Sequence, residues 1–213
     1  MRLKDRYTAI ISWFRENMPV AETELEYTNP YELMVAVILS AQCTDKRVNL
    51  ITPNFFRRFP TIESLAVASQ EDVFEIIRSC SYPNNKAGHL LKASRMVVDR
   101  FGGQLPQEIE ELMTIPGIGR KTANVIASVA FRKQALAVDT HVHRVSARLG
   151  LTRGARTPLE TEKQLTSHID PELYGIAHHW LILHGRYVCQ ARKPKCPECG
   201  LRTFCAYKSK TEN

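Results

Sequence analysis

Apolar residues recur along most of this chain at helical spacing, and residues typical of helix ends separate the apolar segments. The run Leu33–Leu39 is apolar on every side and follows the cap-plus-proline pair Asn29-Pro30, which predicts a central buried helix. Ser69, with Asp72 three residues later, resembles a capping box and predicts another helix start. Helices are therefore expected to begin at Asn29-Pro30 and at Ser69.

Several further helices follow from the same signals: about Lys86 to Phe101, Pro106 to near Met113, a helix after Gly119, and starts at Thr157-Pro158 and Asp170-Pro171. Strand signals are nearly absent, because no Asn-Gly or Asp-Gly turn joins alternating segments. The apolar stretch Ala135–Val138 is short and half alanine, so it is a poor strand candidate. The predicted fold class is all-α.

Composition adds a hint about partners. The 213 residues, 44% of them hydrophobic, are enough for one large or two small folded domains. Lysine and arginine total 29 against 22 acidic residues, a formal charge of +7. This balance suits a polyanion such as nucleic acid, but charge alone is equally consistent with a basic protein that has no nucleic-acid role.

The cysteines are distributed unevenly. Cys43 and Cys80 stand alone and are expected to be ordinary buried thiols, whereas the other four crowd into the tail: Cys189, Cys196, Cys199 and Cys205. Neither a secretory signal, a transit peptide nor a run of 18 apolar residues is evident, so we expect a cytoplasmic, nucleoid-associated protein without a membrane span. In a reducing compartment such a cluster indicates a metal site more than disulfides.

The segment Pro116-Gly117-Ile118-Gly119 joins two expected helices through a tight turn. Its glycines permit positive φ and close approach of the backbone, and the N–H groups that begin the next helix can hold a phosphate oxygen. A P-loop is excluded because Arg120 separates Gly119 from Lys121-Thr122 and a helix precedes the turn. An ordinary helix–helix connection remains the alternative to a nucleic-acid contact.

Five separated motifs together resemble the endonuclease III family of DNA glycosylases, which is of the helix–hairpin–helix, iron–sulfur type. They are Ser40–Asp45, the hairpin Ile115–Ala123, Val138–Val145, His178–Leu181 and the four tail cysteines, all in the family's order along the chain. The resemblance covers essentially the whole sequence. It implies two helical lobes with DNA in the cleft between them.

The resemblance also implies where these lobes divide. A helical barrel domain is expected over 25–134, with the helix–hairpin–helix at about 106–131. Residues 1–24 and 135–213 are expected to form a discontinuous iron–sulfur cluster domain, with the cluster loop at 189–205.

The implied activity is that of a bifunctional DNA glycosylase and AP lyase of base excision repair. By resemblance Lys121 supplies the nucleophilic amine and Asp139 the essential carboxylate. Such an enzyme removes oxidised pyrimidines through a Schiff base and nicks the strand 3′ to the abasic site by β-elimination. Its partner is double-stranded DNA with damaged bases or abasic sites, and a monomer is expected. From residue type alone, Lys121 would be a phosphate-contacting or solvated lysine and Asp139 a helix N-cap.

The resemblance further implies a set of DNA contacts. Gln42 matches the residue that enters the space vacated by the extruded base, although an isolated glutamine would be read as a surface side chain. Tyr82 occupies the position of an apolar wedge, although Ser81-Tyr82-Pro83 departs from the family's Gly, apolar, Tyr pattern. The other expected contacts are Lys86, Gly117, Ile118, Gly119, Arg120, His141, Arg144, Arg192, Lys193 and Lys195.

The tail cysteines have the spacing C-x6-C-x2-C-x5-C. Four thiolates suit either zinc or a [4Fe–4S] cluster, and zinc is the more common ligand of such sets; the resemblance implies the cluster. Two rival functions stay open: a monofunctional glycosylase of the adenine-mismatch type, and a non-catalytic DNA-binding iron–sulfur protein.

Overall fold

The computed structural model describes residues 1–211, and helices are the only regular secondary structure within that range. The all-α prediction is confirmed. The chain divides into two compact units. We call Thr23–Arg132 the central unit and Met1–Glu22 together with Lys133–Asn213 the split unit; the bounds expected from the sequence were 25 and 134.

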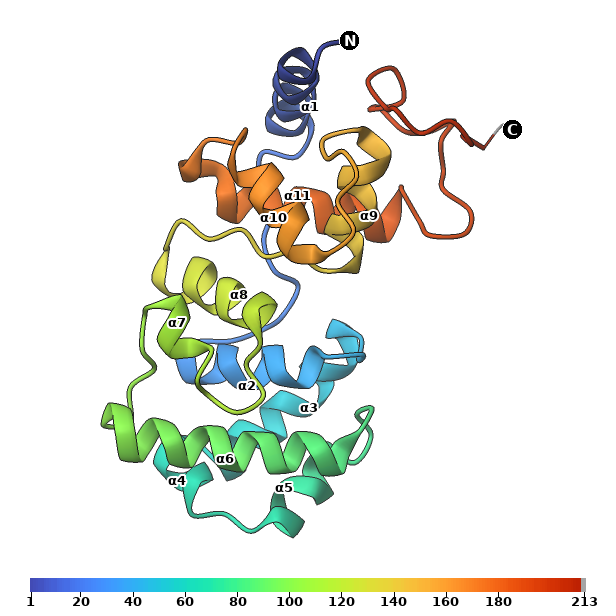
Figure 1. Ribbon diagram of the computed structural model, residues 1–213. Coiled ribbons are helices and arrows are strands. Elements are labelled where there is room, and N and C mark those ends of the chain that lie inside the picture. The colour runs from blue at the N-terminus through green and yellow to red at the C-terminus, as the bar shows by residue number, and fades with distance from the viewer. Residues whose placement is uncertain (212–213) are drawn as a thin grey trace. The chain divides into compact units, whose positions relative to one another are not determined.

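The central unit contains seven helices within the described range (Figure 1): α2 Pro30–Ser40, α3 Asp45–Arg58, α4 Ile62–Ala66, α5 Gln70–Ile77, α6 Pro83–Phe101, α7 Ile109–Leu112 and α8 Arg120–Phe131. Helix α2 is its centre, as its uniform apolarity predicted, with every residue from Tyr31 to Leu39 except Glu32 buried. Asn29 caps α2 by accepting the Glu32 N–H at 3.0 Å. Helices α3, α6 and α8 pack around α2, and α4 and α5 lie along α6.

Two predicted boundaries in the central unit are wrong. Helix α6 begins at Pro83, three residues before the expected start, because Tyr82 takes a left-handed backbone conformation and leads directly into a first-turn proline. Pro106 does not open a helix; α7 begins only at Ile109, after an extended Glu108. A proline fixes its own φ at a value that suits extended chain as well as helix, so the residue alone does not determine the start.

The split unit contains α1 Leu3–Asn17, α9 Thr140–Leu149, α10 Pro158–Thr166, the short 3₁₀ helix η1 Pro171–Leu173 and α11 Tyr174–Tyr187. The N-terminal helix α1 joins the later segment through buried aromatic contacts. Phe14 stacks on Trp180 with ring centroids 5.5 Å apart, and the Tyr7 hydroxyl donates to Leu151 O at 2.8 Å. Ala135–Val138 is buried without forming a strand, as expected.

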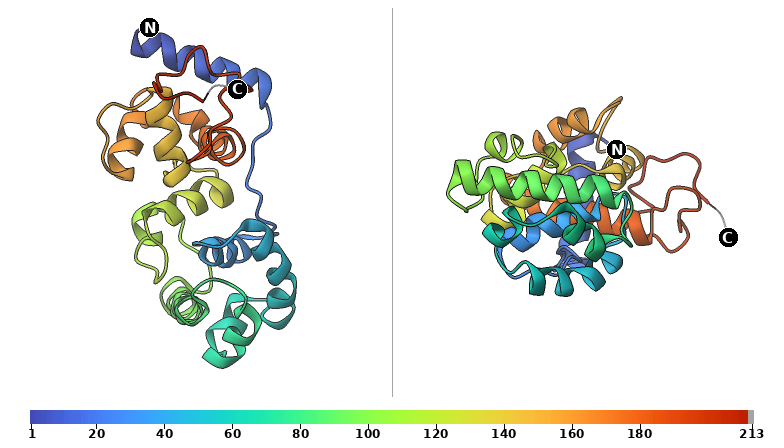
Figure 2. Two further views of the ribbon diagram at one scale, coloured as in Figure 1. Left: turned by 90° about the vertical axis from the view of Figure 1, so that its right-hand side faces the viewer. Right: turned by 90° about the horizontal axis from the view of Figure 1, so that it is seen from below.

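The cysteine-containing tail follows α11 as an irregular segment beside α1 (Figure 2). Gly200 of this tail lies so close to α1 that a Cβ atom there would be 2.4 Å from Cζ2 of Trp13. A side chain at position 200 would therefore force the tail and α1 apart. In the described part of the chain, no helix has the length and apolarity that a membrane crossing requires.

Candidate functional site

The hairpin predicted from its glycines lies between α7 and α8. Gly117 has φ +84°, and a Cβ atom there would approach Cβ of His89 to 2.9 Å. Ile115 and Ile118 are buried and fix the turn to the core of the central unit, with the Ile118 N–H donating to Ile115 O at 3.0 Å. The turn is therefore rigid, and Ile118 can offer only its backbone to a ligand.

The start of α8 faces out from this turn. Its N-cap is Gly119, so no side chain caps the first N–H groups, and no acidic residue occupies the first turn. Arg120 is exposed and Lys121 is half-buried at the first two helical positions. A helix N-terminus with these neighbours attracts an anion and disfavours an ammonium group close to it.

Gln42 and Tyr82 lie on two adjacent loops of the central unit. Both have left-handed backbone conformations, with φ of 54° and 55°, which cost a non-glycine residue on the order of 1–3 kcal/mol. The Ser81 hydroxyl donates to Gln42 O and fastens the two loops together. Tyr82 is 61% exposed, and Gln42 is exposed as well. Two strained residues thus present their side chains from one fastened pair of loops.

Lys86 lies beneath these loops and not on the surface. It is only 5% exposed, and its Nζ donates to Leu39 O at 2.7 Å and to Ser81 Oγ at 3.3 Å. Burial lowers the pKa of Lys86. The family resemblance implied a DNA contact at Lys86, but this ammonium group forms its hydrogen bonds inside the protein. The Lys86 ammonium group is therefore not available to a DNA phosphate.

Asp139 belongs to the split unit and begins α9. Its Oδ1 accepts the Val142 N–H at 2.8 Å, so the carboxylate is held in a defined orientation. One turn on, the Arg144 guanidinium donates to Gly185 O at 2.9 Å and to Cys189 O at 3.2 Å, and it lies 3.1 Å from Nδ1 of His141. His141 and Arg144 are half-buried, and Arg144 ties α9 to the end of α11.

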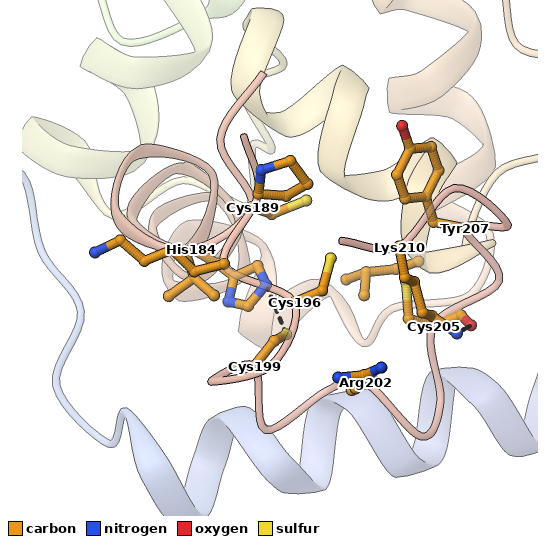
Figure 3. A pocket seen from close by; sticks show the side chains of 12 residues that line it. His184, Cys189, Cys196, Cys199, Arg202, Cys205, Tyr207 and Lys210 are labelled. Atoms are coloured by element: carbon orange, nitrogen blue, oxygen red, sulfur yellow. Dashed lines mark hydrogen bonds between the residues drawn. The ribbon is translucent and has the colours of Figure 1, made fainter. Parts of the chain in front are cut away.

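The four tail cysteines line one pocket that opens to solvent (Figure 3). Burial raises the pKa of the Cys199 and Cys205 thiols, so their thiolates require a compensating cation. Among residues 1–211, no three His, Cys, Asp or Glu side chains are close enough together to ligate a single metal ion. The sulfur atoms surround a common space without converging on one point.

The loop between Cys189 and Cys196 is closed at its base by the Lys195 N–H, which donates to Val188 O at 2.9 Å. Arg148 of α9 holds its first half by donating to Gln190 O at 2.7 Å and to Ala191 O at 2.8 Å. The expected contacts Arg192, Lys193 and Lys195 are all exposed on this loop. Three cations are thus presented from a loop whose backbone is fixed.

Comparison with known proteins bears directly on these features. A family model described as "HhH-GPD superfamily base excision DNA repair protein" matches residues 35–171. Endonuclease III of Bacillus subtilis (strain 168) is 46% identical over 187 residues, which are 88% of this chain and 85% of that protein. Endonuclease III of Escherichia coli (strain K12) is 38% identical over 209 residues, 98% of this chain and 99% of that protein.

The chain belongs to the endonuclease III family. It is a DNA glycosylase and AP lyase of base excision repair. A solved structure of a trapped covalent intermediate of endonuclease III with DNA has a TM-score of 0.92 and 43% identity, covering 97% of each chain. A thermostable thymine-DNA glycosylase has a TM-score of 0.82 at 22% identity and therefore indicates the shared fold alone.

Three supporting residues of this endonuclease III family member were missed by the sequence reasoning. His184 is buried with Nε2 3.7 Å from Cys199 Sγ (Figure 3), and burial lowers its pKa to about 4, so the ring is neutral near pH 7. Arg148 fastens the cysteine loop, and Ser81 fastens the loops that carry Gln42 and Tyr82. A sequence signal existed only for Arg148, which follows Arg144 at helical spacing and thus shares its face.

Proposed function

We propose that this protein removes oxidised pyrimidines from double-stranded DNA with Lys121 as nucleophile and then cleaves the strand by β-elimination. The observation that carries the proposal is the position of Lys121 in the first turn of α8, directly after a glycine turn with no side-chain cap. That turn can hold a DNA phosphate while the lysine reaches the adjacent sugar.

The chemistry requires an uncharged amine. A free lysine is neutral in only about four molecules per ten thousand at pH 7, so a nucleophilic lysine needs surroundings that disfavour the ammonium form. The positive end of the α8 dipole and the partial burial of Lys121 both act in this direction. An exposed lysine in mid-helix would lack both influences.

In the proposed reaction, every bond that breaks leaves its electrons on a defined atom or group. The Lys121 nitrogen bonds to C1′ as the glycosidic bond breaks and the base departs with the bonding electrons. The sugar ring then opens, giving an imine between Lys121 and C1′. Loss of a proton from C2′ expels the 3′ phosphate, and water hydrolyses the imine to release the enzyme.

Asp139 is proposed to act on the positive charge that develops on the sugar and to carry the amine proton. Its pairing with Lys121 rests on the match of both motifs to the family. The hydrogen bond from Val142 N–H holds the carboxylate in one orientation, which suits a group that must interact with a short-lived charge.

The proposed DNA contacts follow from exposure and chemistry. The N–H groups at Gly117 and Gly119 and the Arg120 side chain are proposed to bind phosphates, as are Arg192, Lys193 and Lys195 of the cysteine loop. Ile118 is proposed to contribute by holding the turn in shape, because its own N–H already donates to Ile115 O. His141 and Arg144 are proposed to position the DNA backbone near Asp139. Gln42 and Tyr82 enter the stack where the damaged base is extruded. The protein is proposed to act as a monomer.

The four cysteines are proposed to hold a [4Fe–4S] cluster. Four thiolates around one zinc ion would lie about 3.8 Å apart, given Zn–S bonds of 2.3 Å. The sulfur atoms here line one pocket but do not gather closely enough for a single ion, which suits a larger group. When bound, the cluster cross-links the tail and keeps the basic loop in place. Purified protein containing iron and sulfide supports this assignment, and stoichiometric zinc without iron contradicts it.

The nucleophile is tested with Lys121→Gln on duplexes that contain one abasic site or one oxidised pyrimidine. This variant is expected to lose strand cleavage and borohydride trapping while it keeps DNA binding. The matched control is Arg120→Gln, one residue earlier on the same turn, which is expected to weaken binding but still to give the trapped adduct. A Lys121→Gln protein that forms the adduct at the parent rate removes Lys121 from the mechanism.

The same assay separates the two rival functions. A monofunctional glycosylase releases the base without nicking, and a non-catalytic DNA-binding protein does neither, whereas a lyase leaves a β-eliminated 3′ end. Tyr82→Ala tests the wedge, because unchanged binding to lesion DNA with unchanged excision would exclude Tyr82 from base extrusion.

A further inference from the structure

Two thiols from different loops of the central unit meet beside Gln42 and Tyr82. Cys43 follows Gln42 on the loop between α2 and α3, and Cys80 precedes Ser81 on the loop between α5 and α6. The two thiols lie close enough together that Cys43 contributes to the raised pKa of Cys80. The Ser81 hydroxyl, which donates to Gln42 O at 2.5 Å, brings the same loops together one residue away from each sulfur.

The two thiols differ in accessibility. Cys43 is half-exposed, whereas Cys80 is only 5% exposed. Lys86 lies against both and is itself held by Leu39 O and by Ser81 Oγ. Arg47 adds a second cation to this environment. A partly exposed cysteine near fixed cations is the typical setting of an oxidisable thiol, and a buried thiol in contact with it is the typical resolving partner.

We propose that Cys43 and Cys80 form a redox-modification site, at which a hydroperoxide converts the pair to a disulfide between the two loops. In the first step the Cys43 sulfur attacks the O–O bond, so that the thiol becomes a sulfenic acid and the peroxide is reduced to water or an alcohol. The Cys80 sulfur then bonds to the Cys43 sulfur, and the hydroxyl group leaves as water with the Cys80 proton. Two equivalents of a thiol reverse the reaction.

The buried thiol suits the second step and not the first. Burial, assisted by the neighbouring Cys43, raises the pKa of Cys80 to about 11, so Cys80 remains protonated and does not compete for the oxidant. The order of events is thus set by which thiol is exposed.

Closing the disulfide changes the loops that carry the proposed DNA contacts. The two sulfurs, which are not bonded in this structure, must approach to a bond of about 2.05 Å, and the movement is transmitted to Gln42 and Tyr82 one and two residues away. Both have left-handed backbones and little freedom to compensate. This consequence rests on the proposed function: a displacement of about 1 Å at such residues is expected to slow excision on the order of 10²-fold.

The test uses the full-length protein with its cluster. After limited hydrogen peroxide, free thiols are alkylated, and peptide mass spectrometry is expected to find the Cys43 and Cys80 peptides joined, with the loss of two hydrogens. Cys43→Ser and Cys80→Ala should each abolish the joined peptide. The proposal is overturned if Cys43 is found only as sulfinic or sulfonic acid. It is also overturned if Cys43 stays unmodified while the tail cysteines oxidise.

Activity is measured on the same samples, with cluster absorbance monitored so that damage to the tail is recognised. Excision by the parent protein is expected to fall and to return with dithiothreitol, whereas Cys80→Ala keeps its activity under the same treatment. A joined peptide with unchanged excision refutes the regulatory consequence. If the untreated protein excises no lesion, the proposed function fails, while the joined peptide still establishes the modification site.

Discussion

Asp139 has two roles that a pair of substitutions can separate. Its carboxylate accepts the Val142 N–H at 2.8 Å as the N-cap of α9, and the first turn of α9 contains no other acidic residue. Asparagine caps a helix as well as aspartate does, but it has no charge. Alanine has no charge and cannot cap the helix. Asp139→Asn therefore removes the charge alone, and Asp139→Ala removes both the charge and the hydrogen bond.

The expected stability changes follow from these contacts. Loss of an N-cap hydrogen bond costs about 1 kcal/mol, and loss of a carboxylate at a helix N-terminus costs about 0.3–1 kcal/mol. Asp139→Ala should then lower the free energy of unfolding by about 1–2 kcal/mol, and Asp139→Asn by no more than about 1 kcal/mol. Excision should fall in both variants by about 10²–10⁴-fold, the usual contribution of a proton-transferring group.

Urea unfolding and single-turnover excision measured on both variants give the comparison. The distinguishing result is an Asp139→Asn protein that is nearly as stable as the parent and yet inactive. Full activity of that variant would show that the carboxylate charge has no role in the reaction. Equal destabilisation of the two variants would show that the hydrogen bond to Val142 is not what stabilises α9.

Two further predictions concern the hairpin turn and alkaline pH. Gly117→Ala should destabilise the protein by about 1–3 kcal/mol, because an alanine at φ +84° is strained and its Cβ would lie 2.9 Å from Cβ of His89. The control is Gly88→Ala, inside α6, where an added Cβ has nothing within 4 Å. In the same unfolding assay this variant should be more stable than the parent protein by about 0.5–1 kcal/mol. Burial raises the pKa of Tyr7 and of Tyr31 in the native protein, so their contribution to stability is intact below the unfolded value of 10.0 and is lost as the pH rises above it. Unfolding measured at pH 9 and pH 11 should therefore show a smaller loss of stability in the Tyr→Phe variants than in the parent protein, and an equal loss would contradict this reasoning.

The sequence alone determined those features that depend on residues a few positions apart. The caps at Asn29, Ser69 and Asp139 were predicted because an N-cap bonds an N–H two or three residues later, within a segment that can be inspected directly. The burial of α2 followed from an uninterrupted apolar run, and the turn before α8 was predicted from its two glycines. Only Gly117 needs the freedom of glycine, because it has φ +84° and lies against His89, whereas Gly119 has φ -86° and open space around its Cα. Such signals are local, so they are visible in the sequence.

Tertiary structure decided the features that depend on residues far apart in the chain. Lys86 carries the same charge as any surface lysine, and only the packing of α6 beneath Leu39 O shows that its amine points inward. The meeting of Cys43 with Cys80, and the approach of His184 to Cys199, likewise join loops and helices that have no common sequence pattern. Residue type sets what a side chain can do, but burial and partners, which come from the packing of distant segments, determine which of those possibilities it realises.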